Sequence, residues 1–364
     1  MDVPSGLYID DAIRNQTEGF GWQLVAPEAG GPRQPPRFTL GPIPGPFSDW
    51  FYGDRLAPSC GIYTIDHVSL GSDRVLVKDG HTIFIERTGM HEGSVRDALV
   101  VPEPDRDLHI DEDVVLLCGP AYQIYGHWLI DFLPRLLILR EAGYALETLK
   151  YLVPHNLLNF SWAWLEFLGI PRENIHTYDV VRDRCHIKRA IIPTSIRGNS
   201  RATPILGKMF QEMCTARLGA NTSTPHKKLF VSRALWGNTS RQLTNQDYVQ
   251  NFVQELGFDI IYPERLSITD QIKTFSSARI IMGEYGSGMH NSVLAPAGTE
   301  IVTLRGTMGH PGFLQSGISA ACGQECSYIF GQQNEETGAF TIREHDLELF
   351  RYFLPFLEQT PNAL

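Results

Sequence analysis

Short apolar runs alternate with longer, helix-like segments over most of the chain beyond residue 110. "VVLLC", "KYLVP" and "RAIIPTS" are strand-like in the first series, and "KLFVSR", "FDIIYPE", "RIIM" and "EIVTL" are strand-like in the second. Strands that alternate with helices are typical of parallel α/β layers. The polar stretch "GANTSTPHKK", residues 219–228, separates the two series. The pattern therefore predicts two α/β domains in tandem with a cleft between them.

The chain has 364 residues, of which 43% are hydrophobic, enough to bury the cores of two domains of ordinary size. The first hundred residues are rich in glycine and proline, and "RVLVKDGHTIFIE" reads as a hairpin turning at Asp79 and Gly80. We expect a β-rich elaboration over 1–110, a first Rossmann-like domain over 111–222, a second over 223–342, and a C-terminal helix over 343–364 that packs back across the domains.

Two helices of the second series carry local start and stop signals. Thr244 and Asp247 have the spacing of a capping box, and Gly257 follows as a C-terminal stop. Ser267 and Asp270 repeat the capping-box spacing at the start of the next helix. These signals predict helices over "TNQDYVQNFVQELG", residues 244–257, and "SITDQIKTFSSA", residues 267–278.

Composition excludes some classes of function. The formal net charge is −10, which argues against broad binding to nucleic acid or anionic membranes. The N-terminal residues lack the pattern of a signal peptide, and no apolar run is long enough to span a bilayer, so we expect a cytoplasmic protein. The six scattered cysteines are expected to be free buried thiols. A zinc site at Cys322 and Cys326 with His310 and His345 is a weaker alternative.

The glycine-rich turn "GEYGSGMHN" follows the strand "RIIM" and precedes a short helix. Backbone N–H groups at such a helix start attract phosphate, and glycines let an anion approach closely. The candidate ligand residues are Gly286, Ser287, Gly288, His290 and Asn291. Glycines that only allow close packing of strand and helix would give the same pattern. The spacing differs from the GxGxxG of a dinucleotide site, which disfavours a nicotinamide enzyme.

A second candidate lies in "YGHWLIDFLPRL". On a helix, His127 and Asp131 share one face, so that the carboxylate can orient the imidazole as a general base. From this stretch alone, a structural histidine with a satisfied partner is the simpler interpretation. Pro134 should kink or restart the helix, with Arg135 beyond it.

Three charged residues follow strands of the second series. Arg233 and Arg241 lie in the loop after "LFVSR", where guanidinium groups could hold a diphosphate. Glu264 follows the next strand, where a carboxylate could accept hydrogen bonds from ribose hydroxyls. Surface arginines and a helix-start charge are the simpler alternatives.

Taken together and in this order, "HWLIDFLPRL", "LFVSR" and "GFDIIYPERLSITDQIKTFSSARIIMGEYGSGMHNSVLAPAGTEIV" resemble glycosyltransferase family 61, the DUF563 family, over roughly residues 115 to 305. The resemblance points to a bacterial-type member with a GT-B fold, in which two Rossmann-like domains face each other. It implies an inverting glycosyltransferase of polysaccharide biosynthesis that moves a sugar from a nucleotide diphosphate, with UDP-sugars favoured, to a glycan or lipid-linked saccharide.

The resemblance also implies roles for the candidate residues. The glycine turn and Arg233 would hold the diphosphate, Glu264 would bind the ribose, and His127 with Asp131 would face the sugar from the other domain. Positive groups would replace a metal at the leaving diphosphate, so no cofactor is expected. One position departs from the family's common "GPHGAGLTN" string, because Tyr285 stands where a histidine is usual, and His290 lies one turn away. Glu284 would also repel a phosphate unless it turns outward.

Two alternatives remain at this point. A metal-dependent GT-A transferase would use a DxD pair, which Asp111 and Asp113 could supply, although we expect them in a solvated loop before a strand. A catalytically inactive protein that binds a nucleotide sugar or a glycan on the same fold is the second alternative. Nucleotide binding without turnover would favour that second alternative.

Overall fold

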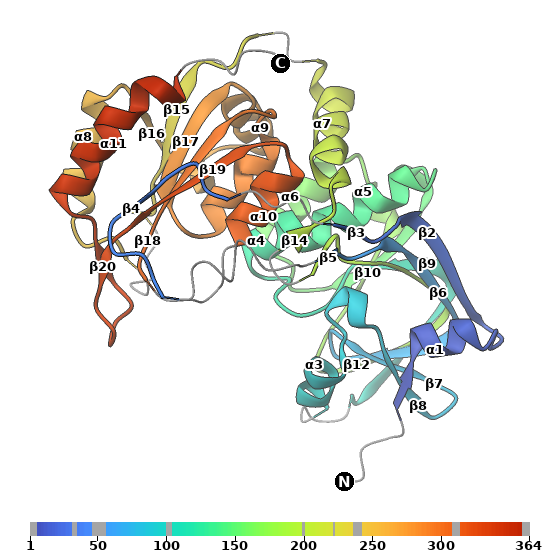
Figure 1. Cartoon of the computed structure of the whole chain (residues 1–364). Coiled ribbons are helices and arrows are strands. Elements are labelled where there is room, and N and C mark those ends of the chain that lie inside the picture. Colours follow the sequence, from blue (N-terminus) through green and yellow to red (C-terminus); the bar gives the residue numbers. More distant parts are fainter. Residues whose placement is uncertain are drawn as a thin grey trace. The chain divides into compact units, whose positions relative to one another are not determined.

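A computed structural model describes residues 6–30, 35–45, 56–99, 104–198, 201–220, 223–235, 242–307 and 314–358. The chain forms two compact units. Unit 1 comprises Met1–Glu28 and Pro58–Gly198, and unit 2 comprises Ala29–Ala57 and Asn199–Leu364. Both units combine helices with sheets, which confirms the α/β class (Figure 1).

Unit 1 is built on one mixed sheet with the strand order β1-β8-β7-β6-β12-β9-β10-β11, and β2 pairs with β6. The strands are β1 (Gly6–Tyr8), β2 (Phe20–Ala26), β6 (Cys60–Gly71), β7 (Val75–Lys78), β8 (His81–Phe84), β9 (Arg106–Leu116), β10 (Lys150–Pro154), β11 (Ile175–Tyr178) and β12 (Asp183–Pro193). Pairs among β9, β10, β11 and β12 are parallel, whereas β6 pairs antiparallel with β2, β7 and β12. Strands from the glycine-rich N-terminal region thus continue the parallel part.

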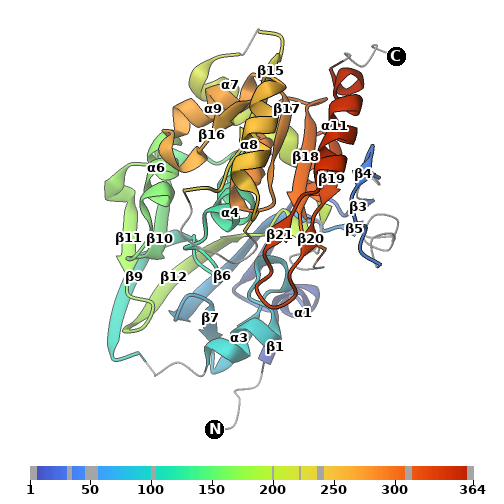
Figure 2. The same cartoon turned by 90° about the vertical axis from the view of Figure 1, so that its left-hand side faces the viewer.

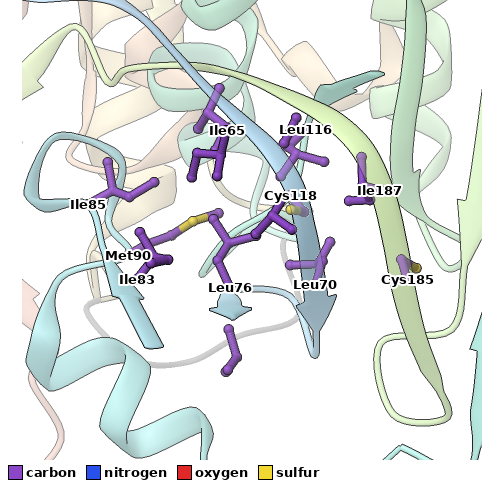
Figure 3. Packing of buried hydrophobic residues seen from close by; sticks show 14 of the residues in the cluster. Ile65, Leu70, Leu76, Ile83, Ile85, Met90, Leu116, Cys118, Cys185 and Ile187 are labelled. Carbon is purple, nitrogen blue, oxygen red and sulfur yellow. The ribbon is translucent and has the colours of Figure 1, made fainter. Parts of the chain in front are cut away.

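One hydrophobic core cluster of unit 1 joins this sheet to α1 and α3. Its members alternate along parts of β6 and β12, as a period of two requires, whereas β7 and β8 contribute consecutive residues. Figure 3 shows Ile65 and Leu70 of β6 beside Leu76, Ile83 and Ile187. The predicted hairpin is confirmed, because β7 and β8 pair antiparallel and Asp79 and Gly80 have φ values of 51° and 78°.

The two longest helices that the structure describes in unit 1 have nine residues each. The described helices of this unit are α1 (Ile9–Arg14), α3 (Glu92–Ala98), α4 (Tyr125–His127), α5 (Leu133–Glu141) and α6 (Asn159–Phe167), with 3₁₀ turns η1 (Glu86–Thr88), η3 (Leu146–Thr148) and η4 (Arg172–Asn174). A π-helical turn, η2 (Trp128–Phe132), joins α4 to α5. Pro134 lies in the first turn of α5. The predicted interruption of the helix at this proline is therefore confirmed, and the π turn is the form that it takes.

Asp111 and Asp113 lie inside β9 rather than in a loop before it, so that part of the prediction was wrong. Their side chains are exposed, as expected. Apolar residues do not alternate here, because Asp111, Glu112 and Asp113 are three consecutive exposed residues beside a register shift between β9 and β12, and this acidic run hides the strand.

Unit 2 is built on a six-stranded sheet with the order β16-β15-β17-β18-β19-β4, and every pair in it is parallel. Its strands are β4 (Thr39–Leu40), β15 (Lys227–Val231), β16 (Asp259–Ile261), β17 (Ala278–Glu284), β18 (Glu300–Arg305) and β19 (Glu325–Phe330). Short pairs outside this sheet are β3 (Ala29–Gly30) with β5 (Leu56–Ala57), β13 (Arg197–Gly198) with β14 (Arg201–Ala202), and β20 (Gln332–Gln333) with β21 (Phe340–Thr341).

Helices α8 and α11 pack on one face of this sheet (Figures 1 and 2). The helices that the structure describes in unit 2 are α7 (Ile205–Leu218), α8 (Gln246–Glu255), α9 (Ile268–Ser276), α10 (Leu314–Ala321) and α11 (Glu344–Leu357), with 3₁₀ helices η5 (Pro263–Arg265) and η6 (Ser287–Leu294). Phe252 of α8 and Phe350 of α11 meet Ile280 and Met282 of β17 in the core. None of the helices in the described part of the chain has both the length and the apolar composition needed to cross a bilayer.

The helix-end signals succeed in part. Ser267 caps α9 by accepting a hydrogen bond from the Asp270 N–H at 3.1 Å, as predicted, and Gly257 follows α8 with a φ of 81°. The predicted cap at Thr244 was wrong. Asn245 occupies the N-cap position of α8 without a side-chain cap, and the Thr244 hydroxyl donates instead to the Phe340 carbonyl. Thr244 therefore bonds to Phe340, which is distant in the sequence, and does not cap α8.

Gly283 in β17 gives a prediction about stability. A Cβ at this position would lie 2.5 Å from the Val231 carbonyl oxygen and 2.8 Å from the Met289 sulfur. Because the first of these is backbone of the adjacent strand, Gly283→Ala should lower the free energy of unfolding by about 1–3 kcal/mol in a urea titration. Gly30→Ala is the matched control, because its Cβ would meet nothing within 4 Å. Equal stability of the two variants would contradict this account.

Candidate functional site

The strand order of unit 2 marks a position for a ligand. Starting from β15, the chain adds β16 on one side and then β17, β18 and β19 on the other. The order reverses between β15 and β17, and open α/β sheets bind ligands at the carboxyl ends of the strands at such a switch point. Arg233 lies two residues after the end of β15, and the glycine turn directly follows β17. Both sequence candidates therefore lie at the switch point of the same unit.

The structure brings Arg233 and Gly286 into contact. Nη1 of Arg233 donates a hydrogen bond to the Tyr285 carbonyl at 3.1 Å. A Cβ at Gly286 would lie 3.3 Å from that Nη1 and 3.4 Å from the guanidinium carbon. A Cβ at residue 286 would therefore press on the guanidinium and displace it by a few tenths of an ångström, although the extended backbone here suits any residue.

Backbone donors in the turn are available beside this guanidinium. The helix after the turn is the 3₁₀ helix η6, whose first internal bond runs from the Met289 N–H to the Gly286 carbonyl. Within the described part of the chain, nothing accepts a hydrogen bond from the N–H groups of Gly286, Ser287 or Gly288. All three residues are partly exposed. Unpaired N–H groups next to a cation form an environment that stabilises an anion.

His290 and Asn291 are buried rather than open at the surface of the turn. The Asn291 amide donates to the Gly288 carbonyl at 3.1 Å, and His290 Nδ1 lies 3.4 Å from Gln315 Oε1 of α10. His290 is 7% exposed and Asn291 is fully buried. These contacts fix the shape of η6, while the predicted role of both side chains as ligand donors stays a prediction.

Tyr285 fills the position where the family commonly has a histidine, and its ring is held on two sides. The Arg305 guanidinium lies over the ring at 4.8 Å from its centre, and the His290 ring meets it edge-on at 6.5 Å. Arg305 ends β18 and is 4% exposed. Sequence reasoning did not select Arg305. The available signal was a basic residue at the carboxyl end of a strand of the same sheet.

Glu284 does not face a ligand across the turn. Its carboxylate is 2% exposed and accepts hydrogen bonds at Oε1 from the Arg233 N–H at 3.2 Å and from Gln246 Nε2 at 2.7 Å. Burial raises the pKa of this carboxyl, and the N–H and the charge of Arg233, together with the Leu243 N–H, offset part of that rise. The carboxylate thus faces the interior, toward the β15 loop and α8.

The other predicted ligand residues of unit 2 are placed only in part. Glu264 lies in η5 and is exposed, and the neighbouring Pro263 would be 3.8 Å from a Cβ at Gly288. The Gln271 amide holds η5 by donating to the carbonyls of Pro263 and Leu266. Arg241 lies outside the described residues, so its predicted role stays a prediction.

In unit 1, the π turn brings His127 and Asp131 together. His127 Nδ1 lies 2.7 Å from Asp131 Oδ2. A proton on Nδ1 leaves Nε2 as the basic nitrogen, and no described residue binds Nε2. The His127 side chain is 40% exposed and that of Asp131 13%, so the imidazole is accessible while its carboxylate partner is sheltered.

Arg197 completes this group and was missed by sequence reasoning. Its Nη2 atom donates a hydrogen bond to Asp131 Oδ2 at 2.8 Å, and its Nε lies 2.7 Å from Oδ1, so the guanidinium forms an ion pair with both carboxylate oxygens. Burial alone would raise the pKa of Asp131, but the charge of Arg197 and the hydrogen bonds from His127 and Arg197 outweigh it and hold that pKa well below its ordinary value. Arg197 lies 66 positions from Asp131, and nothing local marks it as a partner.

Arg135 plays a structural part. It is 2% exposed, donates to the carbonyls of Cys118 and Thr88 at 2.9 and 2.8 Å, and lies over the Phe132 ring at 4.7 Å. The buried guanidinium thereby ties the end of β9 to the turn before α3. It keeps the π turn in place without pairing with the carboxylate of Asp131.

The remaining sequence candidates do not assemble into a site. All six cysteines are free, and five of them are buried, as predicted. Among the described residues no group of three metal-ligating side chains occurs, and His310 lies outside those residues. A pocket of about 540 Å³ in unit 1 is lined by residues that include Ser69, Val77, Thr82 and His186. None of the predicted site residues lines it.

Comparison with known proteins gives one result that bears on this geometry. Residues 125–302 match the family model described as Glycosyltransferase 61. The matched range contains His127, Asp131 and Arg197 of unit 1 and Arg233 and the glycine turn of unit 2. No curated protein sequence matches the chain significantly.

Proposed function

Because residues 125–302 match the model of glycosyltransferase family 61, we propose that this chain is an inverting glycosyltransferase that uses a nucleotide diphosphate sugar. The donor we favour is a UDP-sugar, and the acceptor is a glycan or a lipid-linked saccharide. The family supports glycosyltransferase activity in general, and the finer assignments rest on the residues described above.

Binding of the donor diphosphate is supported by one arrangement above all. The Arg233 guanidinium lies against Gly286, beside three backbone N–H groups, at the switch point of a parallel sheet. A diphosphate needs neutralisation and several donors at once, and a guanidinium with backbone amides supplies both. We expect these groups to stabilise the leaving diphosphate without a metal ion. Glu264 is our candidate for the ribose.

His127 is our candidate for the general base. In one in-line displacement, the acceptor oxygen attacks the anomeric carbon, its proton passes to His127 Nε2, and the bond to the diphosphate breaks with its electron pair on the leaving group. A single step inverts the anomeric configuration and needs only one base. Asp131 and Arg197 support this role, because they hold the imidazole through Nδ1 and leave Nε2 basic.

A melting-temperature screen tests the donor site. We expect one of UDP-, GDP- or dTDP-sugars to raise the melting temperature by several degrees at about 100-fold excess over its dissociation constant, and Arg233→Ala to remove most of the rise. A CMP-sugar, which lacks the diphosphate, should have a smaller effect. A screen in which no nucleotide sugar stabilises the chain would overturn the donor site.

The competing proposal is an inactive protein that binds a nucleotide sugar or a glycan. It predicts stabilisation by the nucleotide with neither transfer nor hydrolysis of the donor. Product formation from the stabilising donor, detected by release of the free nucleotide, decides between the two.

A further inference from the structure

We propose that Glu284 and Tyr285 preorganise Arg233 for the diphosphate, with Arg305 as a further positioning residue that acts through Tyr285. The inference rests on the proposed function and adds residues to its donor site. It also gives the departure from the family's histidine a physical role. Three sets of contacts within unit 2 carry it.

The backbone of Arg233 is held by Glu284. The buried Glu284 carboxylate accepts from the Arg233 N–H at 3.2 Å, from Gln246 Nε2 at 2.7 Å, and also from the Leu243 N–H. It therefore connects both ends of the segment between β15 and α8. Ser232 adds a second connection, because its hydroxyl oxygen accepts from the amides of Gln246 and Gln250. The position of the Arg233 Cα is thus fixed before any ligand binds.

The guanidinium of Arg233 is held by Tyr285, the residue after Glu284. Nη1 donates to the Tyr285 carbonyl at 3.1 Å, and the planar group lies against Gly286. A free arginine side chain loses about 2 kcal/mol of rotamer freedom when it is immobilised. Ordering the side chain in the unbound protein removes much of that cost from binding.

The Tyr285 peptide is itself fixed on two sides. Its N–H donates to the Leu304 carbonyl at 2.8 Å, and its ring packs beneath the guanidinium of Arg305, the residue after Leu304. The ring is 5% exposed and also meets the His290 edge. Contact with a cation over the ring is worth about 0.5–2 kcal/mol, enough to keep the carbonyl of Tyr285 aimed at Arg233.

This arrangement also accounts for an acidic residue so close to an anion site. A carboxylate that faced the diphosphate would repel it. The Glu284 carboxylate instead accepts hydrogen bonds from three donors of its own unit. The backbone N–H of Arg233 donates to that carboxylate, whereas its guanidinium donates to the Tyr285 carbonyl of the turn.

Double-mutant cycles with Arg233→Ala test the inference. UDP, GDP and dTDP are titrated against the wild-type chain by calorimetry, and the one that binds is used as the probe. Glu284→Ala, Tyr285→Ala and Arg305→Met should each weaken its binding by about three- to tenfold. Tyr285→Phe keeps the ring and should bind like the wild type. In the Arg233→Ala background, the same three substitutions should have no further effect.

Glu300→Ala is the matched control for the loss of a buried carboxylate. Glu300 is also 2% exposed and hydrogen-bonded, to Ser327 and Arg37, but it lies at the opposite end of its strand from the turn. It should lower the melting temperature without weakening nucleotide binding. If Glu284→Ala does not fold, Tyr285→Ala against Tyr285→Phe gives the same test.

The outcomes distinguish failure of the proposed donor site from failure of the proposed positioning of Arg233. If none of the three nucleotides binds the wild-type chain, the donor site is wrong, and the inference falls with it. If one binds and the losses from Glu284→Ala and Tyr285→Ala persist unchanged in the Arg233→Ala background, those residues do not act through Arg233. In that case only the inference is overturned.

Discussion

Replacing His127 with alanine should lower turnover of the acceptor by about 10²- to 10⁴-fold, the usual contribution of a positioned general base. The KM for the donor should stay within about twofold, because a base acts in the transition state and makes no ground-state contact with the nucleotide. Initial rates over a range of donor concentrations measure both turnover and the KM for the donor, and nucleotide affinity is measured separately. Full activity of the variant would remove His127 from the mechanism.

His176→Ala is the matched control for that substitution. His176 Nε2 lies 2.7 Å from Glu112 Oε2, and its side chain is 40% exposed, which is the same distance and the same histidine exposure as in the His127–Asp131 pair, although Glu112 is more exposed than Asp131. It also belongs to unit 1. If pairing with a carboxylate on an accessible histidine were enough to affect turnover indirectly, both substitutions would reduce it equally. We expect His176→Ala to leave turnover unchanged.

The parts of the fold that follow from short-range patterns could be predicted from the sequence. The hairpin at Asp79–Gly80 needs only two residues that tolerate positive φ. Strands β15 and β17 were recognisable as apolar runs, so that Arg233 and Gly286 could be placed at the ends of two parallel strands. Their contact then follows from the strand order, which places β15 next to β17.

The parts that depend on distant partners could not be predicted. Arg197 pairs with Asp131 across 66 positions, and Arg305 reaches Tyr285 from the neighbouring strand. Arg305 is marked only as a basic residue at the end of a strand, and nothing local marks Arg197, because the sequence does not show which carboxylate or ring each arginine will meet. Thr244 is a further example, because its hydroxyl donates to the Phe340 carbonyl 96 positions away and does not form the capping box that the sequence predicts.

The two kinds of residue have different chemistry in the proposed site. Residues predicted from the sequence, such as His127, Arg233 and Gly286, are those that would touch a substrate. Residues found only in the structure, Arg197 and Arg305, hold the first group in place by charge or by packing. Substrate-facing residues cluster in recognisable strings, whereas their supports can come from any element that passes nearby.

Asp131→Asn should produce the second large effect, on both turnover and stability. An asparagine that donates to His127 Nδ1 would favour the tautomer with a proton on Nε2, which cannot accept another, so turnover should fall by about 10²-fold or more. Loss of the charge also removes the ion pair between Asp131 and the sheltered Arg197, which should cost about 3 kcal/mol of unfolding free energy. Urea titrations and initial rates at pH 7 measure the two effects.

The pH dependence of that stability loss follows from the depressed pKa of Asp131. A carboxyl with a lower pKa in the folded than in the unfolded state stabilises the fold above its unfolded pKa of about 3.9, and the contribution disappears as pH falls toward the folded value. The gap between wild type and Asp131→Asn should therefore be constant from pH 7 to about pH 5 and shrink below about pH 4. Asp183→Asn separates stability from catalysis: Asp183 is buried, pairs with Arg106 and has a lowered pKa through that hydrogen bond, so its loss should destabilise the fold and spare turnover. Equal losses of turnover in the two variants would mean that Asp131 acts only by supporting the fold.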